Sequence, residues 1–280
     1  MGRRIDWTRE HVWILGASSG IGRALAEALA GRGASLTLSA RESDRFRAVV
    51  DTCATEGGGS GVTVTAEPVD LADPAEARRV AENVAARQER PVTTVIYAAG
   101  VSQRALLLEM SEEVVDRVVN VNFRSAVAVA RILGPRMQAA GSGRLVFLSS
   151  LAAYAPTPFR GVYSASKSAL GVTAATLRAE LAPSGVDVTL VVPGFVRTAI
   201  SERALRADGA VHGIIDPNQA SGMDPGECAR RILHGIERGV GEFSVAMGFK
   251  GRLALLMGRL APRLQKRLLA RIPTSAESRS

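Results

Sequence analysis

Tyr163 and Lys167 stand four residues apart in the stretch YSASK, in a chain with only three tyrosines and three lysines among 280 residues. In a helix, residues at positions i and i+4 share one face. A lysine ammonium beside a phenol favours the phenolate, so we expect Lys167 to lower the pKa of Tyr163 from its ordinary value of about 10. The pair would then serve as an acid or base near neutral pH.

Two serines, Ser149 and Ser150, end the preceding apolar stretch RLVFLSS. In an open α/β sheet the ligand crevice lies at the carboxyl ends of the strands, so a hydroxyl there can face a substrate. Each serine alone fits a simple turn hydroxyl equally well. Their chemical interest depends on Tyr163 lying nearby.

A glycine cluster, GASSGIG at residues 16–22, follows the first apolar stretch and leads into a helical pattern. Glycine permits a sharp turn and a close approach, and a helix N-terminus offers free N–H groups to a pyrophosphate. Arg41, which comes after Ala40 at the end of the second expected strand, stands where an acidic residue would bind the ribose hydroxyls of NAD. A guanidinium there favours NADP(H), with NAD(H) as the alternative. Arg41 could otherwise simply begin the next helix at the surface.

The elements that must position these residues alternate along the chain between short apolar stretches and longer helical patterns. We expect strands at 11–15, 35–39, 62–69, 93–98, 144–149, 186–192 and 242–246. We expect helices near 20–31, 41–56, 73–88, 111–140, 161–182 and 224–238. This alternation predicts a single doubly wound Rossmann domain of the α/β class, with a mostly parallel seven-stranded sheet. The stretch 195–223 interrupts the rhythm and is a candidate mobile lid.

A second unit, the basic amphipathic extension 249–280, follows the catalytic domain expected at 1–248. Pro262 should divide it into two short helices. Its apolar stripe and its basic flanks comprise Leu253, Leu256, Met257, Leu260, Leu264 and Leu268, with Arg252, Arg259, Arg263 and Lys266. Peripheral contact with an anionic membrane through 249–271 suits this pattern. Docking on the domain itself or on a partner subunit suits it equally well.

Composition excludes several classes of protein. The net charge of +8 comes from arginines spread along the whole chain, which argues against nucleic-acid binding. The lone cysteines Cys53 and Cys228 and the three scattered histidines predict no metal site and a reduced, cytoplasmic setting. The N-terminus lacks the apolar core of a signal peptide, and no apolar run is long enough to span a bilayer.

Taken in order, these motifs resemble the classical short-chain dehydrogenases/reductases over about residues 11–246. The resemblance rests on GASSGIG, VNVNF (119–123), Ser150 thirteen residues before Tyr163, YSASK and PGFVRT (193–198). It implies that Tyr163 exchanges the substrate proton, Ser150 polarises the carbonyl and Lys167 binds the nicotinamide ribose. Asn122 would position a water in the proton relay, with Asn120 as its rival within the motif.

The resemblance also implies a set of cofactor contacts. These are Gly16, Ser18, Ser19, Gly20, Ile21, Gly22, Arg41, Asp70, Leu71, Ala99, Gly100, Tyr163, Lys167, Pro193, Gly194, Val196 and Thr198. One departure from the family pattern is YAAG (97–100), where NNAG is common. A sheet-stabilising asparagine is lost there, and Tyr97 needs room and a partner for its hydroxyl.

The function implied is an NADP(H)-dependent oxidoreductase that interconverts a carbonyl and a secondary alcohol, with tyrosine as the acid/base. The alternative is a non-catalytic NAD(P)-binding regulatory or scaffold protein. Apolar content around the expected cleft suggests a hydrophobic substrate, lipid-, acyl- or steroid-like, for example a 3-oxoacyl thioester or a 3-ketosphinganine. The resemblance further implies a homodimer or homotetramer joined through the helices at 111–140 and 161–182.

Overall fold

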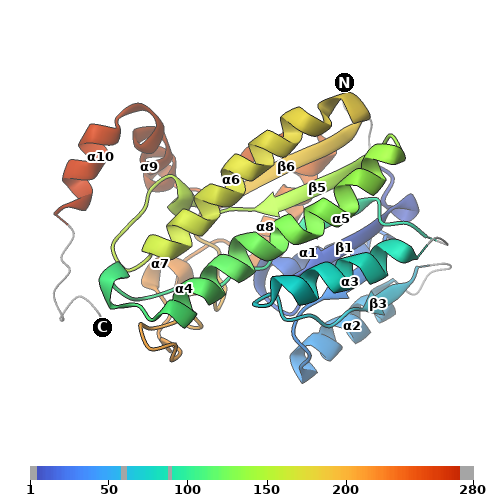
Figure 1. Cartoon of the computed structure of the whole chain (residues 1–280), viewed down its shortest axis with the longest axis horizontal. Coiled ribbons are helices and arrows are strands. Elements are labelled where there is room, and N and C mark those ends of the chain that lie inside the picture. Colours follow the sequence, from blue (N-terminus) through green and yellow to red (C-terminus); the bar gives the residue numbers. More distant parts are fainter. Residues whose placement is uncertain (1–4, 58–61, 88–89, 272–280) are drawn as a thin grey trace.

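A computed structural model describes residues 5–57, 62–87 and 90–271. One sheet organises the chain, with strand order β3-β2-β1-β4-β5-β6-β7 and every neighbouring pair parallel (Figure 1). The strands are β1 (His11–Leu15), β2 (Ser35–Ser39), β3 (Val64–Ala66), β4 (Thr94–Tyr97), β5 (Gly143–Leu148), β6 (Val186–Pro193) and β7 (Glu242–Val245). The predicted doubly wound α/β domain is confirmed, and its sheet is wholly rather than mostly parallel.

Helices cover both faces of this sheet. They are α1 (Gly20–Ala30), α2 (Asp44–Glu56), α3 (Pro74–Ala86), α4 (Glu112–Val119), α5 (Ser125–Ala139), α6 (Gly161–Leu181), α7 (Pro217–Ala220), α8 (Pro225–Glu237), α9 (Phe249–Leu260) and α10 (Pro262–Leu269). One apolar core joins α1, α2 and α8 to one face of the sheet, and a second joins α3, α5 and α6 to the other face. Since both faces are covered, the central strands are buried along their whole length.

Two elements differ from the sequence-based expectation. The edge strand β3 covers 64–66 rather than 62–69, because it pairs with β2 alone. The helix expected over 111–140 is interrupted by a π-helical turn, Asn120–Arg124, which separates α4 from α5. The periodicity of apolar residues cannot predict the extra residue of a π turn. Such turns are frequent at functional sites.

The helices α9 and α10 lie together at one end of the molecule (Figure 1). The predicted division at Pro262 is confirmed, since α9 ends at Leu260 and α10 begins at the proline. Residues 272–280 of the expected extension lie outside the described residues. Within the described chain, none of the helices combines the length and apolar character needed to cross a bilayer.

Candidate active site

The turn between β1 and α1 requires glycine at specific positions. Gly16 has φ of +89°, and a Cβ there would lie 2.6 Å from the backbone nitrogen of Ala99. A Cβ on Gly22 would lie 2.2 Å from the carbonyl oxygen of Gly16. Ser19 precedes α1 without capping it through its side chain. The first N–H groups of this helix are therefore available to an anion such as a pyrophosphate.

A cleft of about 780 Å³ lies beside this turn, at the carboxyl ends of the central strands. All of the expected cofactor contacts line it: Gly16, Ser18, Ser19, Gly20, Ile21, Gly22, Arg41, Asp70, Leu71, Ala99, Gly100, Tyr163, Lys167, Pro193, Gly194, Val196 and Thr198. The residues present fit a nicotinamide dinucleotide. The glycines of the turn leave room for the cofactor to approach the backbone, and the free N–H groups of α1 and the guanidinium of Arg41 can bind its phosphates. Within the described residues, no cluster of three His, Cys, Asp or Glu could hold a metal.

The expected catalytic side chains Ser150, Tyr163 and Lys167 meet in the same cleft. Tyr163 lies in the first turn of α6, and the hydroxyl of Ser150, just after β5, is near enough to lower the pKa of its phenol. Lys167, one helical turn further along α6, donates to the carbonyl oxygens of Leu148 (2.9 Å) and Ala99 (3.4 Å). The i, i+4 spacing thus brings both side chains to the ends of β4 and β5.

Burial dominates the electrostatics of this group. It raises the pKa of Tyr163 above its ordinary value, although the hydrogen bond from Ser150 and the positive charge of Arg160 act in the opposite direction. The expected net lowering of the pKa of Tyr163 is therefore wrong. Burial also lowers the pKa of Lys167 to about 8, since its ammonium is removed from water. A phenol with a raised pKa stays protonated near neutral pH, which is the form a proton donor needs.

Asn122 lies in the π turn and is fully buried, but it does not line the cleft. Its side-chain amide exchanges hydrogen bonds with the backbone of Val101, 2.8 Å to the N–H and 2.9 Å to the carbonyl, and donates to Ser166. This side chain fixes the segment after β4 to α6. The rival, Asn120, donates instead to the carbonyl oxygen of Ala72 on the far side of the turn.

Two further residues have structural contacts. The hydroxyl of Ser149 donates to the carbonyl oxygen of Lys167, which leaves Ser150 as the serine at the phenol. Tyr97 is fully buried and donates to the carbonyl oxygen of Val121 at 2.7 Å. The departure from the family pattern at this position is thus accommodated, because the tyrosine ties β4 to the π turn.

The candidate lid at 195–223 contributes residues to the lining of the cleft, and its two ends are joined to each other. Val196 pairs with Met223, and the buried side chain of Gln219 donates to the carbonyl oxygen of Val196 at 2.8 Å. Its middle is fixed by Leu205, which forms a bridge to Gln103 in the segment after β4.

Sequence reasoning missed two features next to the cleft. Arg104 and Arg160 both donate to one carboxylate oxygen of Asp216 in the lid, at 2.7 and 3.1 Å. The side chain of Gln103 accepts from the backbone N–H of Tyr163 at 2.8 Å and so holds the start of α6. These partners are 56 to 112 residues apart along the chain, so no local pattern could have indicated them.

Comparisons with known proteins agree with this geometry. The family model for short chain dehydrogenases matches residues 10–208. A dehydrogenase/reductase SDR family member 7B from Danio rerio is 33% identical over 270 residues, covering 96% of this chain and 87% of the relative. A dehydrogenase/reductase SDR family protein 7-like from Drosophila melanogaster is 32% identical over 267 residues, covering 95% of this chain and 81% of the relative.

Solved structures give the same result. A short-chain dehydrogenase from Sphingobium yanoikuyae in complex with NADPH superposes with a TM-score of 0.76 at 28% identity, covering 95% of this chain and 97% of the other. A short-chain dehydrogenase/reductase from Burkholderia phymatum in complex with NAD gives 0.77 at 25% identity, covering 97% and 98%. The chain therefore belongs to the short-chain dehydrogenase/reductase family and is an NAD(P)-dependent oxidoreductase that interconverts carbonyls and alcohols.

Proposed function

We propose that Tyr163 is the acid/base of this reaction, with Ser150 and Lys167 as its partners. The observation that carries the proposal is that the buried phenol, Ser150 and Lys167 meet in the cleft that also holds the glycine turn. In the reductive direction Tyr163 donates its proton to the substrate oxygen, while Ser150 polarises the carbonyl. The nicotinamide, when bound, supplies the hydride.

Lys167 and Asn122 support the proton donor. Lys167 holds the nicotinamide ribose and stabilises the phenolate that remains after proton transfer. Its ammonium is held at the strand ends by the carbonyl oxygens of Leu148 and Ala99. Asn122 positions the relay by which a proton returns to Tyr163, and its rigid contacts with Val101 support that role.

NADP(H) is the preferred cofactor in this proposal, with NAD(H) as the alternative. Arg41 lines the cleft two residues after the end of β2, and the residue between them is Ala40 rather than an acidic residue. A carboxylate there would bind ribose hydroxyls and repel an extra phosphate, whereas a guanidinium pairs with it. Among the solved relatives, the protein from Sphingobium yanoikuyae binds NADPH and the one from Burkholderia phymatum binds NAD.

The proposed substrate is a carbonyl or secondary alcohol on a hydrophobic body, lipid-, acyl- or steroid-like. Apolar side chains line the outer part of the cleft, among them Leu151, Phe195, Ile200 and Val211. A 3-oxoacyl thioester or a 3-ketosphinganine would present such a body. Gly251, in the first turn of α9, also lines the cleft, so the C-terminal helices begin next to the opening.

Tyr163→Phe tests the catalytic assignment. We expect kcat/KM to fall by about 10²–10⁴-fold, because the proton donor is removed, while the dissociation constant of NADPH stays within about twofold. Tyr154→Phe is the matched control, since Tyr154 donates to Glu242 and does not line the cleft. A panel of ketones and alcohols, assayed with NADPH and NADH, measures substrate class and cofactor together. Retention of most turnover by Tyr163→Phe would refute the assignment.

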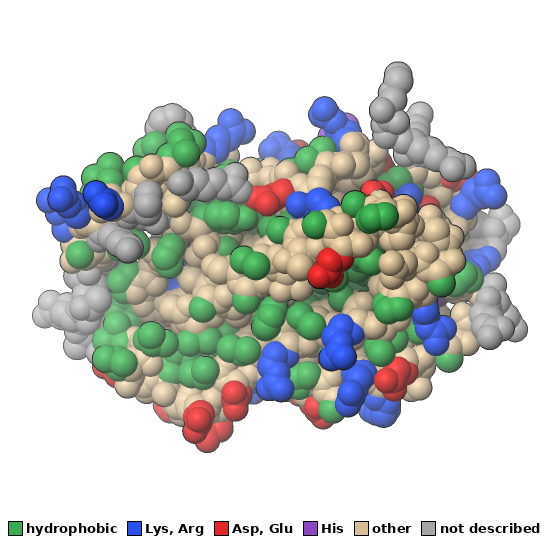
Figure 2. All heavy atoms as spheres, turned by 45° about the horizontal axis from the view of Figure 1, so that its top comes forward, with side chains coloured by type: hydrophobic (Ala, Val, Ile, Leu, Met, Phe, Trp, Pro, Cys, Tyr) green, Lys and Arg blue, Asp and Glu red, His purple; other side chains and the backbone are tan. Residues whose placement is uncertain are grey.

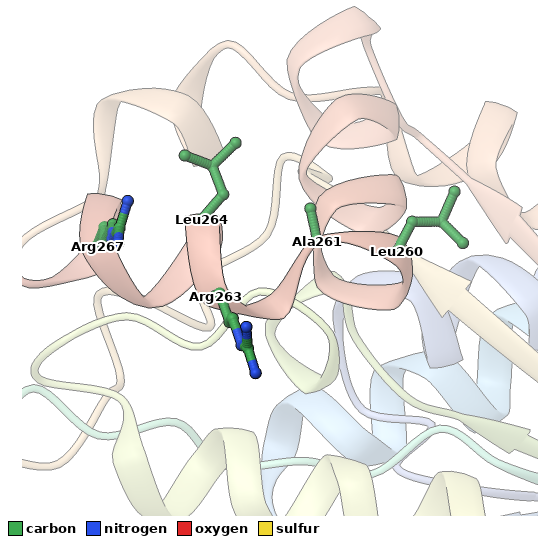
Figure 3. Close-up of a pocket in the computed structure, with 5 residues that line it drawn as sticks. All are labelled: Leu260, Ala261, Arg263, Leu264 and Arg267. Carbon is green, nitrogen blue, oxygen red and sulfur yellow. The ribbon is translucent and has the colours of Figure 1, made fainter.

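We also propose that 249–280 is a separate unit that contacts anionic membrane surfaces through 249–271. Seven lysines and arginines and no acidic residue occupy 249–271. Five leucines there are exposed: Leu253, Leu256, Leu260, Leu264 and Leu268. Figure 2 shows apolar and basic side chains together at this end of the molecule. A groove of about 470 Å³ runs between α9 and α10, where Leu264 and Arg263 point to opposite sides (Figure 3).

Sedimentation with lipid vesicles tests this membrane contact. We expect binding to vesicles that contain phosphatidylglycerol, weaker binding at high salt, and little binding to neutral vesicles. Leu256→Asp with Leu260→Asp should abolish binding, whereas Leu108→Asp, in the exposed turn Leu107–Glu109 outside α9 and α10, is the control. Binding that is equal for neutral and anionic vesicles would contradict the proposal.

A homodimer or homotetramer in a cytoplasmic setting completes the proposed function. The side chain of Val172 on α6 is 69% exposed, which supports a subunit contact through α6 and the helices before it. Cys53 and Cys228 are both buried and free, which supports a reduced compartment. Sedimentation velocity measures the assembly, and a protein that stays monomeric at all concentrations tested would contradict it.

A further inference from the structure

Three arginines from two distant parts of the chain gather at the cofactor end of the cleft. Arg41 lies between β2 and α2 and Arg45 lies in the first turn of α2, whereas Arg203 lies in the lid. Arg203 and Arg41 both line the cleft, and Nη1 of Arg203 donates to the hydroxyl of Ser19 at 3.3 Å. Burial and the positive charges of Arg45 and Arg41 lower the pKa of Arg203, although Glu202 opposes them. The guanidinium group of Arg203 is therefore near enough to those of Arg41 and Arg45 to be repelled by them.

Among the residues that the structure describes, no carboxylate lies at ion-pair distance from this cluster. Within the described chain, none of the ion pairs involves Arg41, Arg45 or Arg203. Arg160, another arginine that lines the cleft, does have such a partner, since it pairs with Asp216. Like charges that lie close together without a counter-ion raise the electrostatic free energy of the unliganded protein. An anion bound among them would remove this repulsion.

The backbone on both sides of Arg203 is fixed. Thr198 lies against the glycine turn, since a Cβ on Gly20 would be 3.1 Å from its methyl group. On the other side Ala204 and Leu205 are buried, and the backbone N–H of Leu205 donates to the carbonyl oxygen of Ser102 at 2.9 Å. The arginine is thus held over the phosphate turn by contacts that do not involve its own side chain.

We propose that Arg203 is a specificity-determining residue, which binds the extra ribose phosphate of NADP(H) together with Arg41. The proposal rests on the proposed preference for NADP(H) and extends it to the lid. The phosphate would join the lid to the turn after β2, so the occupied cofactor site would hold residues 195–223 closed. An arginine from a lid is suited to this task, because its planar fork pairs with phosphate oxygens at two points.

Arg203→Gln tests the proposal by cofactor binding, measured through nucleotide fluorescence without substrate. We expect the dissociation constant of NADPH to rise about tenfold, the lower range for one charge-assisted contact at a partly exposed site, with that of NADH changed less than twofold. Arg206→Gln is the matched control: Arg206 is an exposed lid arginine three residues further on that does not line the cleft. In the double variant with Arg41→Gln, the loss should be smaller than the product of the two single losses, since both contacts serve one phosphate.

Hydrogen exchange of the lid is the second measurement. NADPH should slow exchange across 195–223 more than NADH does, and Arg203→Gln should abolish that difference. The proposal would be overturned if Arg203→Gln weakened the binding of NADPH and NADH equally. It would also be overturned if the wild type preferred NADPH and Arg203→Gln weakened the binding of neither cofactor. A wild type without a preference for NADPH would instead refute the cofactor preference on which the proposal rests, so the two failures are distinguishable.

Discussion

Lys167→Met should remove a pH dependence of stability that the wild-type protein carries. Lys167 is 3% exposed, and its ammonium donates hydrogen bonds to the carbonyl oxygens of Leu148 and Ala99 rather than to a carboxylate. Burial lowers the pKa of this lysine from its ordinary 10.5 to about 8. At neutral pH the folded protein therefore maintains a charge in a place that disfavours it.

The magnitude follows from the two pKa values. One pKa unit of difference between folded and unfolded protein is worth about 1.4 kcal/mol. Between about pH 8 and pH 10.5 the unfolded chain binds this proton and the folded protein does not, so the free energy of unfolding rises with pH. Below about pH 8 both states bind it and the contribution is constant. From pH 7 to pH 10 the gain is about 2.5 kcal/mol.

Urea unfolding of both proteins at pH 7 and pH 10, without cofactor, measures the effect. Groups with raised pKa values, such as Tyr97 and Cys228, destabilise the fold at high pH, but they act in both proteins and cancel in the comparison. We expect the stability of wild type relative to Lys167→Met to improve by about 2.5 kcal/mol between the two pH values.

Two further measurements test whether Lys167 is the source of this pH dependence. Lys167→Arg keeps a cation that does not titrate in this range and should behave like the methionine variant. With only three lysines in the chain, carbon-13 labelling of the lysine Cε atoms gives few resonances, and the one lost in Lys167→Met identifies Lys167. A wild type and a variant whose stabilities change in parallel with pH would refute the reasoning, as would a lysine resonance that titrates near 10.

Three further changes have defined outcomes. Ser150→Ala removes a hydrogen bond that lowers the pKa of Tyr163, so the alkaline limb of the pH profile for reduction should move to higher pH, with kcat about a hundredfold lower. Gly22→Ala places a Cβ 2.2 Å from a carbonyl oxygen of the glycine turn, and should cost about 1–3 kcal/mol in urea unfolding and weaken NADPH binding in a fluorescence titration. Tyr97→Phe leaves the buried carbonyl of Val121 without its donor, and should cost about 1–2 kcal/mol in urea unfolding with kcat unchanged.

The strands and the glycine turn were predictable because their signals are local. Trp13 and Ile14 of β1 are fully buried, as the apolar run HVWIL requires of a central parallel strand. Gly16 and Gly22 follow at the spacing of a tight turn, and both positions exclude a side chain in the structure. The i, i+4 spacing of YSASK likewise indicated the shared helix face without further information.

The remaining features depend on contacts between distant segments. The pKa of Tyr163 has the opposite direction to the expected one, because burial depends on the assembled cleft and not on neighbours in the sequence. The π turn around Asn122 is fixed by hydrogen bonds to the backbone of Val101. Arg203 was identified through its hydrogen bond to Ser19, which lies 184 residues earlier in the chain. A single sequence carries no signal for such pairings.

The order of the sheet has a consequence for the time course of folding. β1 pairs with β4, so Val12 adjoins Thr94, and this central pairing joins strands separated along the chain by three helical connections, through α1, α2 and α3. Parallel pairings between such distant segments form slowly. Residues from both sides of the β1–β4 pairing line the nucleotide cleft. A nascent chain should therefore bind the nucleotide only after β1 and β4 have paired. Thereafter, nucleotide saturation should suppress separation of the two halves and protect the chain from proteolysis.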